Sequence, residues 1–177
     1  MRRRRLLAAL GAAAVAVPGS GAFTSVTAER DAEVDLENDA DAYLGLVDLG
    51  AGGRSETDAG RLTFSFPSDS EPSQLGLGSD SIYRFETDAG TTDPGLFEVT
   101  NQGANTVEVY ASQTNTSGVP AISIFDVADP ATVLDGNPDS VTLAPGQSFE
   151  GGVRIDTHGV SIQNAPYEVT LTLHAEL

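Results

Sequence analysis

The chain has 177 residues, of which 26 are acidic and 9 are basic, and its formal net charge is −17. It contains no cysteine, and every basic residue is arginine, which excludes disulfides, thiolate zinc sites, cysteine nucleophiles and catalytic lysines. A strongly negative protein repels nucleic acid and anionic lipid, whereas 40% hydrophobic residues suffice for one core of ordinary size.

The first 22 residues have the organisation of a secretory signal peptide. Residues 2–5 are all arginine, residues 6–17 form an apolar run, and a tail of small residues ends at Ala22. The apolar run is too short to span a bilayer, which takes about 20 residues. Residues 3–7 also fit the twin-arginine pattern, and the sequence leaves both the twin-arginine and the general secretory route open. We expect cleavage after Ala22, and one exported domain over residues 23–177 at the cell surface or outside the cell.

Removal of the leader makes the chain still more acidic. Four arginines lie in the leader and no acid precedes Glu29, so residues 23–177 carry 26 acids against five arginines, a net charge of −21. Self-repulsion of this size opposes compaction in dilute buffer, whereas molar salt shortens the Debye length to about 3 Å. Lysine-free, acid-rich exported chains resemble the proteins of extremely halophilic archaea, and a hydrated acidic surface explains most of these carboxylates together.

The first element after the leader is a long amphipathic strand. One parity of residues 26–36 is apolar except for Arg30, and the other parity is acidic from residue 31 onward. This alternation predicts a strand with one core face and one acidic face. The apolar parity comprises Val26, Ala28, Ala32, Val34 and Leu36.

The rest of the chain keeps a period of two between turns rich in Gly, Pro, Asn and Asp. It predicts strands at residues 43–49, 61–66, 81–86, 96–101, 107–112, 121–127, 140–143 and 149–155, and a last strand from Tyr167 to Leu177. Residues 50–60 and 67–80 have little apolar content and are expected to be exposed, mobile loops. The fold class predicted is all-β, an antiparallel two-sheet sandwich of about nine or ten strands that follows the cleaved leader.

Few residues indicate chemistry. The two histidines are His158, in a turn, and His174, on the polar parity of the last strand, where we expect a solvent-facing side chain. No HExxH motif occurs, and the serine of residues 146–150 lacks the final glycine of a nucleophile elbow. We therefore predict no enzymatic activity, no catalytic residue and no cofactor.

Two weaker sites come from loop motifs. Asp135, Asn137 and Asp139 place oxygens at alternate positions, as a calcium loop does, but the glycine and the terminal glutamate of such a loop are missing. A turn that uses Gly, Asn and Pro for their backbone geometry explains the same residues, and it is the interpretation that we favour. Asn115 begins the single N-glycosylation sequon, in a polar turn of an exported chain, so modification there is open.

Several segments carry a family resemblance. They are residues 21–30 (Gly-Ala-Phe-Thr-Ser-Val-Thr-Ala-Glu-Arg), 42–46 (Ala-Tyr-Leu-Gly-Leu), 96–103 (Leu-Phe-Glu-Val-Thr-Asn-Gln-Gly) and 143–148 (Leu-Ala-Pro-Gly-Gln-Ser). In their order after a short leader, the chain resembles small exported β-sandwich proteins of haloarchaea that carry a domain of unknown function. Those proteins are related to archaeal bundling-pilus subunits and to the TasA/camelysin biofilm-matrix proteins.

The resemblance implies a jelly-roll-like sandwich that polymerises by donor-strand complementation, in which the N-terminal segment of one subunit completes the sheet of the next. Residues 23–37 would be the donor strand, with Val26, Ala28, Val34 and Leu36 as the inserting side chains. Arg30 departs from an ideal donor strand. Some camelysin relatives are described as metalloproteases, and no motif of this chain matches that activity.

The sequence thus predicts a structural protein of the cell surface or extracellular matrix whose partners are copies of itself or related envelope proteins. No partner nucleic acid and no membrane span after the leader are expected. The alternative is an ordinary first strand in a monomeric envelope module that binds a sugar or a protein without catalysis. An N-terminal strand fits both, because a strand pairs equally with its own sheet or with a neighbour's edge.

Overall fold

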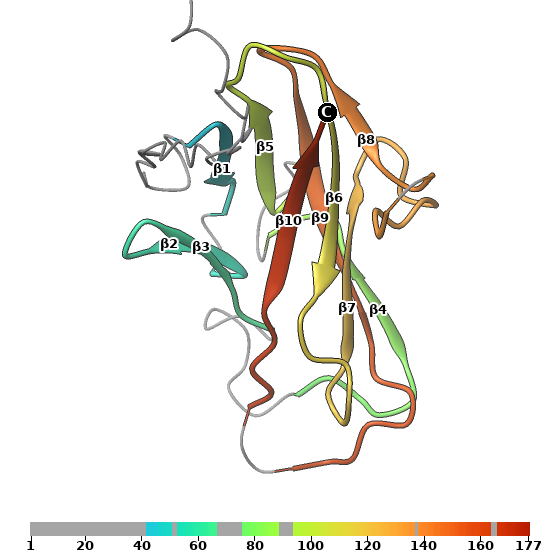
Figure 1. The fold of residues 1–177 in the computed structure, drawn as a ribbon. Helices are drawn as coiled ribbons and strands as arrows, with labels where there is room; N and C mark the ends of the chain where they lie inside the picture. Colours follow the sequence, from blue (N-terminus) through green and yellow to red (C-terminus); the bar gives the residue numbers. More distant parts are fainter. Residues whose placement is uncertain (1–41, 51–52, 67–75, 89–93, 137, 164–165) are drawn as a thin grey trace, which may run out of the picture. The chain divides into compact units, whose positions relative to one another are not determined.

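The computed structural model describes residues 42–50, 53–66, 76–88, 94–136, 138–163 and 166–177, and these residues form a β-sandwich (Figure 1). The leader and the expected strand at residues 26–36 lie outside the described residues. Within the described part the structure has strands and turns but no helix, as predicted. The strands are β1 (Leu44–Asp48), β2 (Ser55–Asp58), β3 (Arg61–Phe64), β4 (Ile82–Phe85), β5 (Phe97–Asn101), β6 (Val107–Gln113), β7 (Ala121–Asp126), β8 (Val141–Leu143), β9 (Ser148–Asp156) and β10 (Leu171–Glu176).

The larger sheet is built around the long strand β9. β7 pairs with β9 along one edge, from Ala121 opposite Asp156 to Asp126 opposite Gly151. On the other edge β4 pairs with residues 153–156 and β5 with residues 148–151, so β4 and β5 lie end to end. The Gly95 N–H donates to the Glu86 carbonyl (2.7 Å), which joins the chain just after β4 to the chain just before β5. β1 extends the sheet beyond β5.

The smaller sheet has the order β10-β6-β8, and all of its pairings are antiparallel. Figure 1 shows β1 and the β2–β3 hairpin on the β10 side of the described domain, and β7 beside β8 on the other. The sandwich therefore has two different flanks, one between β1 and β10 and one between β7 and β8.

The hairpin of β2 and β3 is a separate two-stranded sheet, and it corrects the prediction that residues 50–60 form a mobile loop. Ala59 and Gly60 make its two-residue turn, with φ of 49° and 80°. Positive φ at both central positions is the backbone of a type I′ turn, whose twist matches that of paired strands. Ser55 is 1% exposed and its hydroxyl donates to the Leu96 carbonyl, so this end of the hairpin is fixed to the sandwich.

The core lies between the inner faces of the two sheets. Its fully buried members are Leu96, Phe97, Val99, Val109, Ile124, Leu134, Leu143, Phe149, Val153 and Ile155. The alternation of β5 and β9 supplies Phe97, Val99, Phe149, Val153 and Ile155, and the others come from β6, β7, β8 and the adjoining loops. In the described part of the chain, no helix is long and apolar enough to cross a membrane.

The last strand is shorter than predicted, because β10 begins at Leu171 rather than Tyr167. The alternation of half-buried and exposed side chains does continue back to Tyr167. However, β6 ends at Gln113, and the bond from the Thr114 N–H to the Thr170 carbonyl is the last one of this ladder. The pattern therefore predicted the exposure of residues 167–170 but not that they pair with no other strand among the described residues.

Candidate functional site

One flank of the sandwich is closed by hydrogen bonds. The Leu134 N–H donates to the Ile124 carbonyl of β7 (2.9 Å), and the Leu134 carbonyl accepts from Ala111 of β6 (3.0 Å). Gln113 completes this flank: its Oε1 accepts from the Ile122 N–H (2.7 Å) and its Nε2 donates to the Pro120 carbonyl (3.0 Å). The outer edge of β7 is therefore covered, which is how sheets avoid unwanted strand addition.

The opposite flank, between β1 and β10, is open. Within the described residues, β10 pairs only with β6, and β1 pairs only with β5. β1 is partly shielded, since β2 and β3 lie against it and Thr57 donates to Asp48 (2.6 Å). β10 therefore presents an edge without a described neighbour, and such an edge can accept another strand.

Apolar side chains along this flank are incompletely covered. Leu171 and Leu173 of β10 face the core, as do Leu44 and Leu46 of β1, yet all four are only half-buried. Core-facing leucines are normally among the most buried residues of a domain. The core-facing leucines at the β1 and β10 edges of the two sheets are therefore only partly covered by the described residues.

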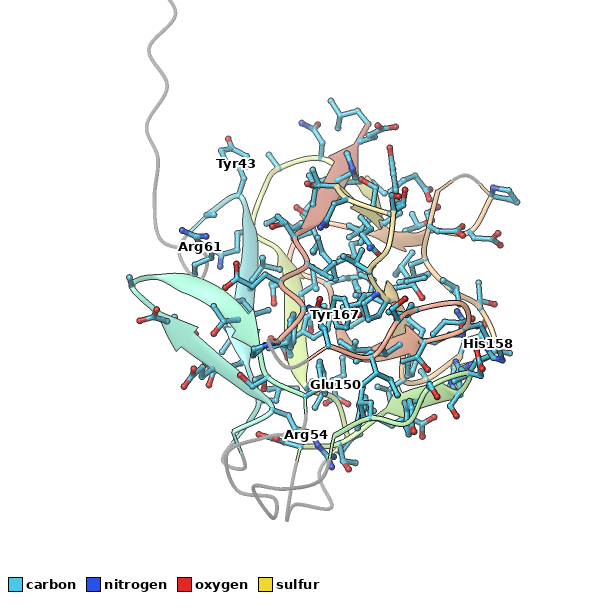
Figure 2. The ribbon with its side chains drawn as sticks, turned by 90° about the horizontal axis from the view of Figure 1, so that it is seen from below. Tyr43, Arg54, Arg61, Glu150, His158 and Tyr167 are labelled. Atoms are coloured by element: carbon cyan, nitrogen blue, oxygen red, sulfur yellow. The ribbon has the colours of Figure 1, made fainter. Side chains whose placement is uncertain are left out.

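An apolar hollow of about 240 Å³ lies at one end of the open flank. Tyr43 and Leu44 line it at the start of β1, Val107 lines it from β6, and Ala175 and Leu177 line it at the end of β10. Tyr43 is 83% exposed and Leu177 is 92% exposed, and Figure 2 shows the Tyr43 ring pointing away from its strand. Exposed large apolar groups around a concave surface are typical of interaction sites.

Buried Asn101 shapes the floor of this hollow. Its Nδ2 donates to the carbonyls of Asn105 (2.8 Å) and Leu143 (2.9 Å), and its Oδ1 accepts from the Gly103 N–H (3.0 Å). These bonds fix the turn between β5 and β6. The Gln102 N–H donates to the Tyr43 carbonyl, so the described chain begins beside the hollow.

The outward face of the smaller sheet carries a polar cluster that the sequence did not predict. His174 is half-buried rather than simply solvent-facing, because its ring stacks on Tyr110, 4.6 Å between centroids. The Ser112 hydroxyl lies 2.8 Å from His174 Nε2, and the Tyr110 hydroxyl donates to Glu176 (2.7 Å). That bond to Glu176 raises the pKa of Tyr110. A catalytic triad would need a carboxylate on the other ring nitrogen of His174, and within the described residues none is bonded there.

The second histidine lies in a different place. His158 Nδ1 is 2.7 Å from Asp156 Oδ1, and Arg154 donates to the other oxygen of the same carboxylate (3.0 Å). The hydrogen bond from the His158 side chain lowers the pKa of Asp156. In Figure 2 His158 lies on the opposite side of the described domain from Tyr43, so the His158 cluster is not part of one site with the hollow.

The loop sites predicted from the sequence remain separate from the open flank. Asp135 and Asp139 are exposed, Gly136 and Asp139 form an isolated bridge, and Asn137 lies outside the described residues. In the part that the structure describes, no group of three acids or histidines is placed to hold a metal ion. Asn115 is exposed in the loop after β6 and donates to the Glu168 carbonyl (3.4 Å).

Val26, Ala28, Val34 and Leu36 lie outside the described residues, so the structure leaves their predicted role as donor side chains untested. No protein-family model matches the chain, and no curated protein matches it.

Proposed function

We propose that this protein is an exported, non-catalytic subunit of a cell-surface or extracellular-matrix assembly, which polymerises when the N-terminal strand of one copy adds to the sandwich of another. The observation that carries the proposal is the open edge of β10 with its half-buried leucines. A strand whose one parity is apolar would cover those leucines and gain main-chain hydrogen bonds, as in β-augmentation.

The N-terminal segment has the pattern that this edge requires. Its apolar parity includes Val26, Ala28, Val34 and Leu36, and its other parity is acidic from Asp31 to Glu37. When the apolar side chains cover the core, the acids face solvent, which suits a hydrated surface in strong salt. The segment also directly precedes β1, which begins beside the open flank.

Deletion of residues 23–37 tests the proposal. We expect a folded subunit that no longer forms filaments, observed by electron microscopy and by light scattering in molar salt. A synthetic peptide of residues 23–37 should bind this deletion variant. If the strand instead belongs to its own subunit, the deletion removes several buried apolar side chains, each contributing about 1.5–3 kcal/mol, and the protein should not fold.

The Val34→Asp substitution separates the two cases further. A charge in a donor strand should abolish the polymer but leave the melting temperature of the monomer unchanged. The exposed-parity substitution Glu33→Gln is the matched control and should leave both unchanged. Loss of monomer stability, with no polymer in the parent protein, would contradict the proposal and support the monomeric envelope module.

A further inference from the structure

We infer the direction and the register of the added strand: the N-terminal segment of one copy runs antiparallel to β10 of the next copy, with Leu36 opposite Leu171. The inference rests on the proposed function and specifies its acceptor. It uses the chemistry of the β10 edge, the place of the hollow and the short length of chain between the strand and β1.

The acceptor edge is β10 rather than β1. Both are edge strands in the described part, but β1 has the β2–β3 hairpin against it and β10 has no such neighbour. The core-facing parity of β10 continues from Leu171 and Leu173 to Ala175 and Leu177, and its exposure rises toward Leu177. An added strand therefore meets four apolar positions in one row.

The donor parity fits this row in one antiparallel register. Leu36, Val34 and Ala32 lie opposite Leu171, Leu173 and Ala175, and Arg30 then lies opposite Leu177. Leu177 is 92% exposed, so the guanidinium of Arg30 reaches solvent there and its place among apolar residues is explained. Val26 and Ala28 continue past the end of β10 toward the apolar hollow.

Neighbouring registers place polar or charged side chains against the apolar row of β10. A shift by two residues in one direction puts Arg30 opposite Ala175, within the apolar row, and a shift in the other direction puts Asn38 opposite Leu171. Burial of either polar group without a partner is unfavourable. A shift by one residue turns the acids toward the core.

The linker decides between the two strand directions. Only residues 38–41 separate the end of the segment from the described domain, and four extended residues reach at most about 14 Å. In the antiparallel direction the segment leaves its acceptor at the Leu171 end, about 20 Å along β10 from the hollow. The end of the donor subunit that carries the apolar hollow then lies against the Leu171 end of the acceptor subunit. Each copy can therefore both donate and accept a strand.

The parallel direction leads to a different assembly. The segment would leave its acceptor beside Leu177, where Tyr43 near the start of the acceptor's described residues also lines the hollow. The ends of the two subunits that carry the apolar hollow would then face each other. This geometry favours a closed dimer in which the two copies exchange their N-terminal strands. Open filaments require the heterologous, head-to-tail contact. The antiparallel direction supplies that contact.

Cysteine cross-linking tests the inference, because the chain has no cysteine of its own. Chains that carry Leu36→Cys alone are mixed in molar salt with chains that carry Leu171→Cys alone, each expressed with the native leader. Paired positions of adjacent strands lie within disulfide reach. We expect a disulfide-linked dimer of the two variants on a non-reducing gel, and the Val34→Cys with Leu173→Cys pair should give the same result.

Other outcomes separate the failure of the register from the failure of assembly. Cross-linking of Leu36→Cys to Ala175→Cys and of Ala32→Cys to Leu171→Cys, and not of Leu36→Cys to Leu171→Cys, would overturn the antiparallel direction while leaving donor-strand addition intact, because only a parallel strand makes both pairs. An intramolecular disulfide in a chain that carries both Leu36→Cys and Leu171→Cys, without any link between mixed single-variant chains, would overturn the proposed function. Filaments that cross-link at none of these pairs would overturn the choice of β10.

Discussion

Two consecutive glycines in β9 leave room for an aromatic ring on each face of the larger sheet. A Cβ on Gly151 would overlap the ring of Phe97, which is buried in the core. A Cβ on Gly152 would overlap Phe125, which points to the outer face and is nonetheless fully buried, because Arg84 lies over its ring at 4.4 Å. The absence of side chains at these two positions therefore permits close packing at the centre of the longest strand.

Gly151→Ala should destabilise the domain by about 1–3 kcal/mol, because the methyl group and the Phe97 ring cannot occupy the same space. Urea unfolding at constant molar KCl measures the effect. Gly76→Ala is the control, since a Cβ there meets nothing within 4 Å. Equal midpoints for the two variants would contradict this account of β9.

Glu108 of the central strand β6 connects that strand to the outer strand β8 through its carboxylate. It accepts hydrogen bonds from Ser140 and from Thr142 (2.8 Å), both next to or within β8. The Ser140 bond is the main cause of the lowered pKa of Glu108, and the Thr142 bond adds to it.

Ser140→Ala should raise the pKa of Glu108 toward the ordinary value of about 4.3. Because the folded-state pKa is the lower one, this contribution to stability is complete above about pH 5 and is lost as the pH falls through the folded value. The variant should therefore lose less stability on acidification than the parent. NMR titration of the Glu108 carboxyl checks the shift, and an unchanged titration would exclude the Ser140 bond as its cause.

At the scale of elements, the connection between β6 and β7 depends on one side chain. Gln113 accepts from the Ile122 N–H and donates to the Pro120 and Asn115 carbonyls, so it replaces a missing strand at the edge of β7. Half-buried main-chain groups that lose such a partner raise the free energy of the folded state.

Gln113→Ala should lower the free energy of unfolding by about 1–3 kcal/mol. Gln113→Glu keeps an acceptor for the Ile122 N–H but loses the two N–H donors. Its free energy of unfolding at neutral pH should therefore lie between those of the parent and the alanine variant. Faster hydrogen exchange of the Ile122 amide in the alanine variant would locate the effect. An Ile122 amide with unchanged protection would show that Gln113 is not its partner in solution.

Alternation of apolar and polar residues predicted strands wherever one face was buried, as in β5 and β9. β2 was missed because Ser55–Asp58 contains no apolar residue, and its pairing follows from the Ala59–Gly60 turn. The end-to-end arrangement of β4 and β5 was also not predictable, since both strands are placed by their registers with distant β9. For the same reason the alternation predicts an amphipathic strand at residues 26–36, which lies outside the described residues, whereas the open edge of β10 depends on which described strands neighbour it in space.

At the scale of the whole molecule, the net negative charge is accompanied by a local cluster of carboxylates on the larger sheet. Glu98 of β5 lies directly opposite Glu150 of β9, and both line the same shallow depression together with Asp126. Like charges directly opposite each other on adjacent strands are destabilising, and salt screens this repulsion. With a net charge of −17 on the chain, we expect stability to rise steeply with salt concentration.

Glu150→Gln tests whether the local pair contributes to that dependence. In about 0.2 M KCl, where the Debye length is still several ångströms, the variant should be more stable than the parent by about 0.2–1 kcal/mol. In about 3 M KCl the difference should shrink toward zero, because screening already removes the repulsion. Glu168→Gln changes the net charge equally but lies in an extended segment before β10, outside any paired strand, so it should give the smaller gain at low salt. Equal gains in stability from the two variants would mean that the total charge, and not the Glu98–Glu150 pair, sets the salt dependence at this face. A melting temperature of the parent protein that is the same at both salt concentrations would contradict the role of charge repulsion itself.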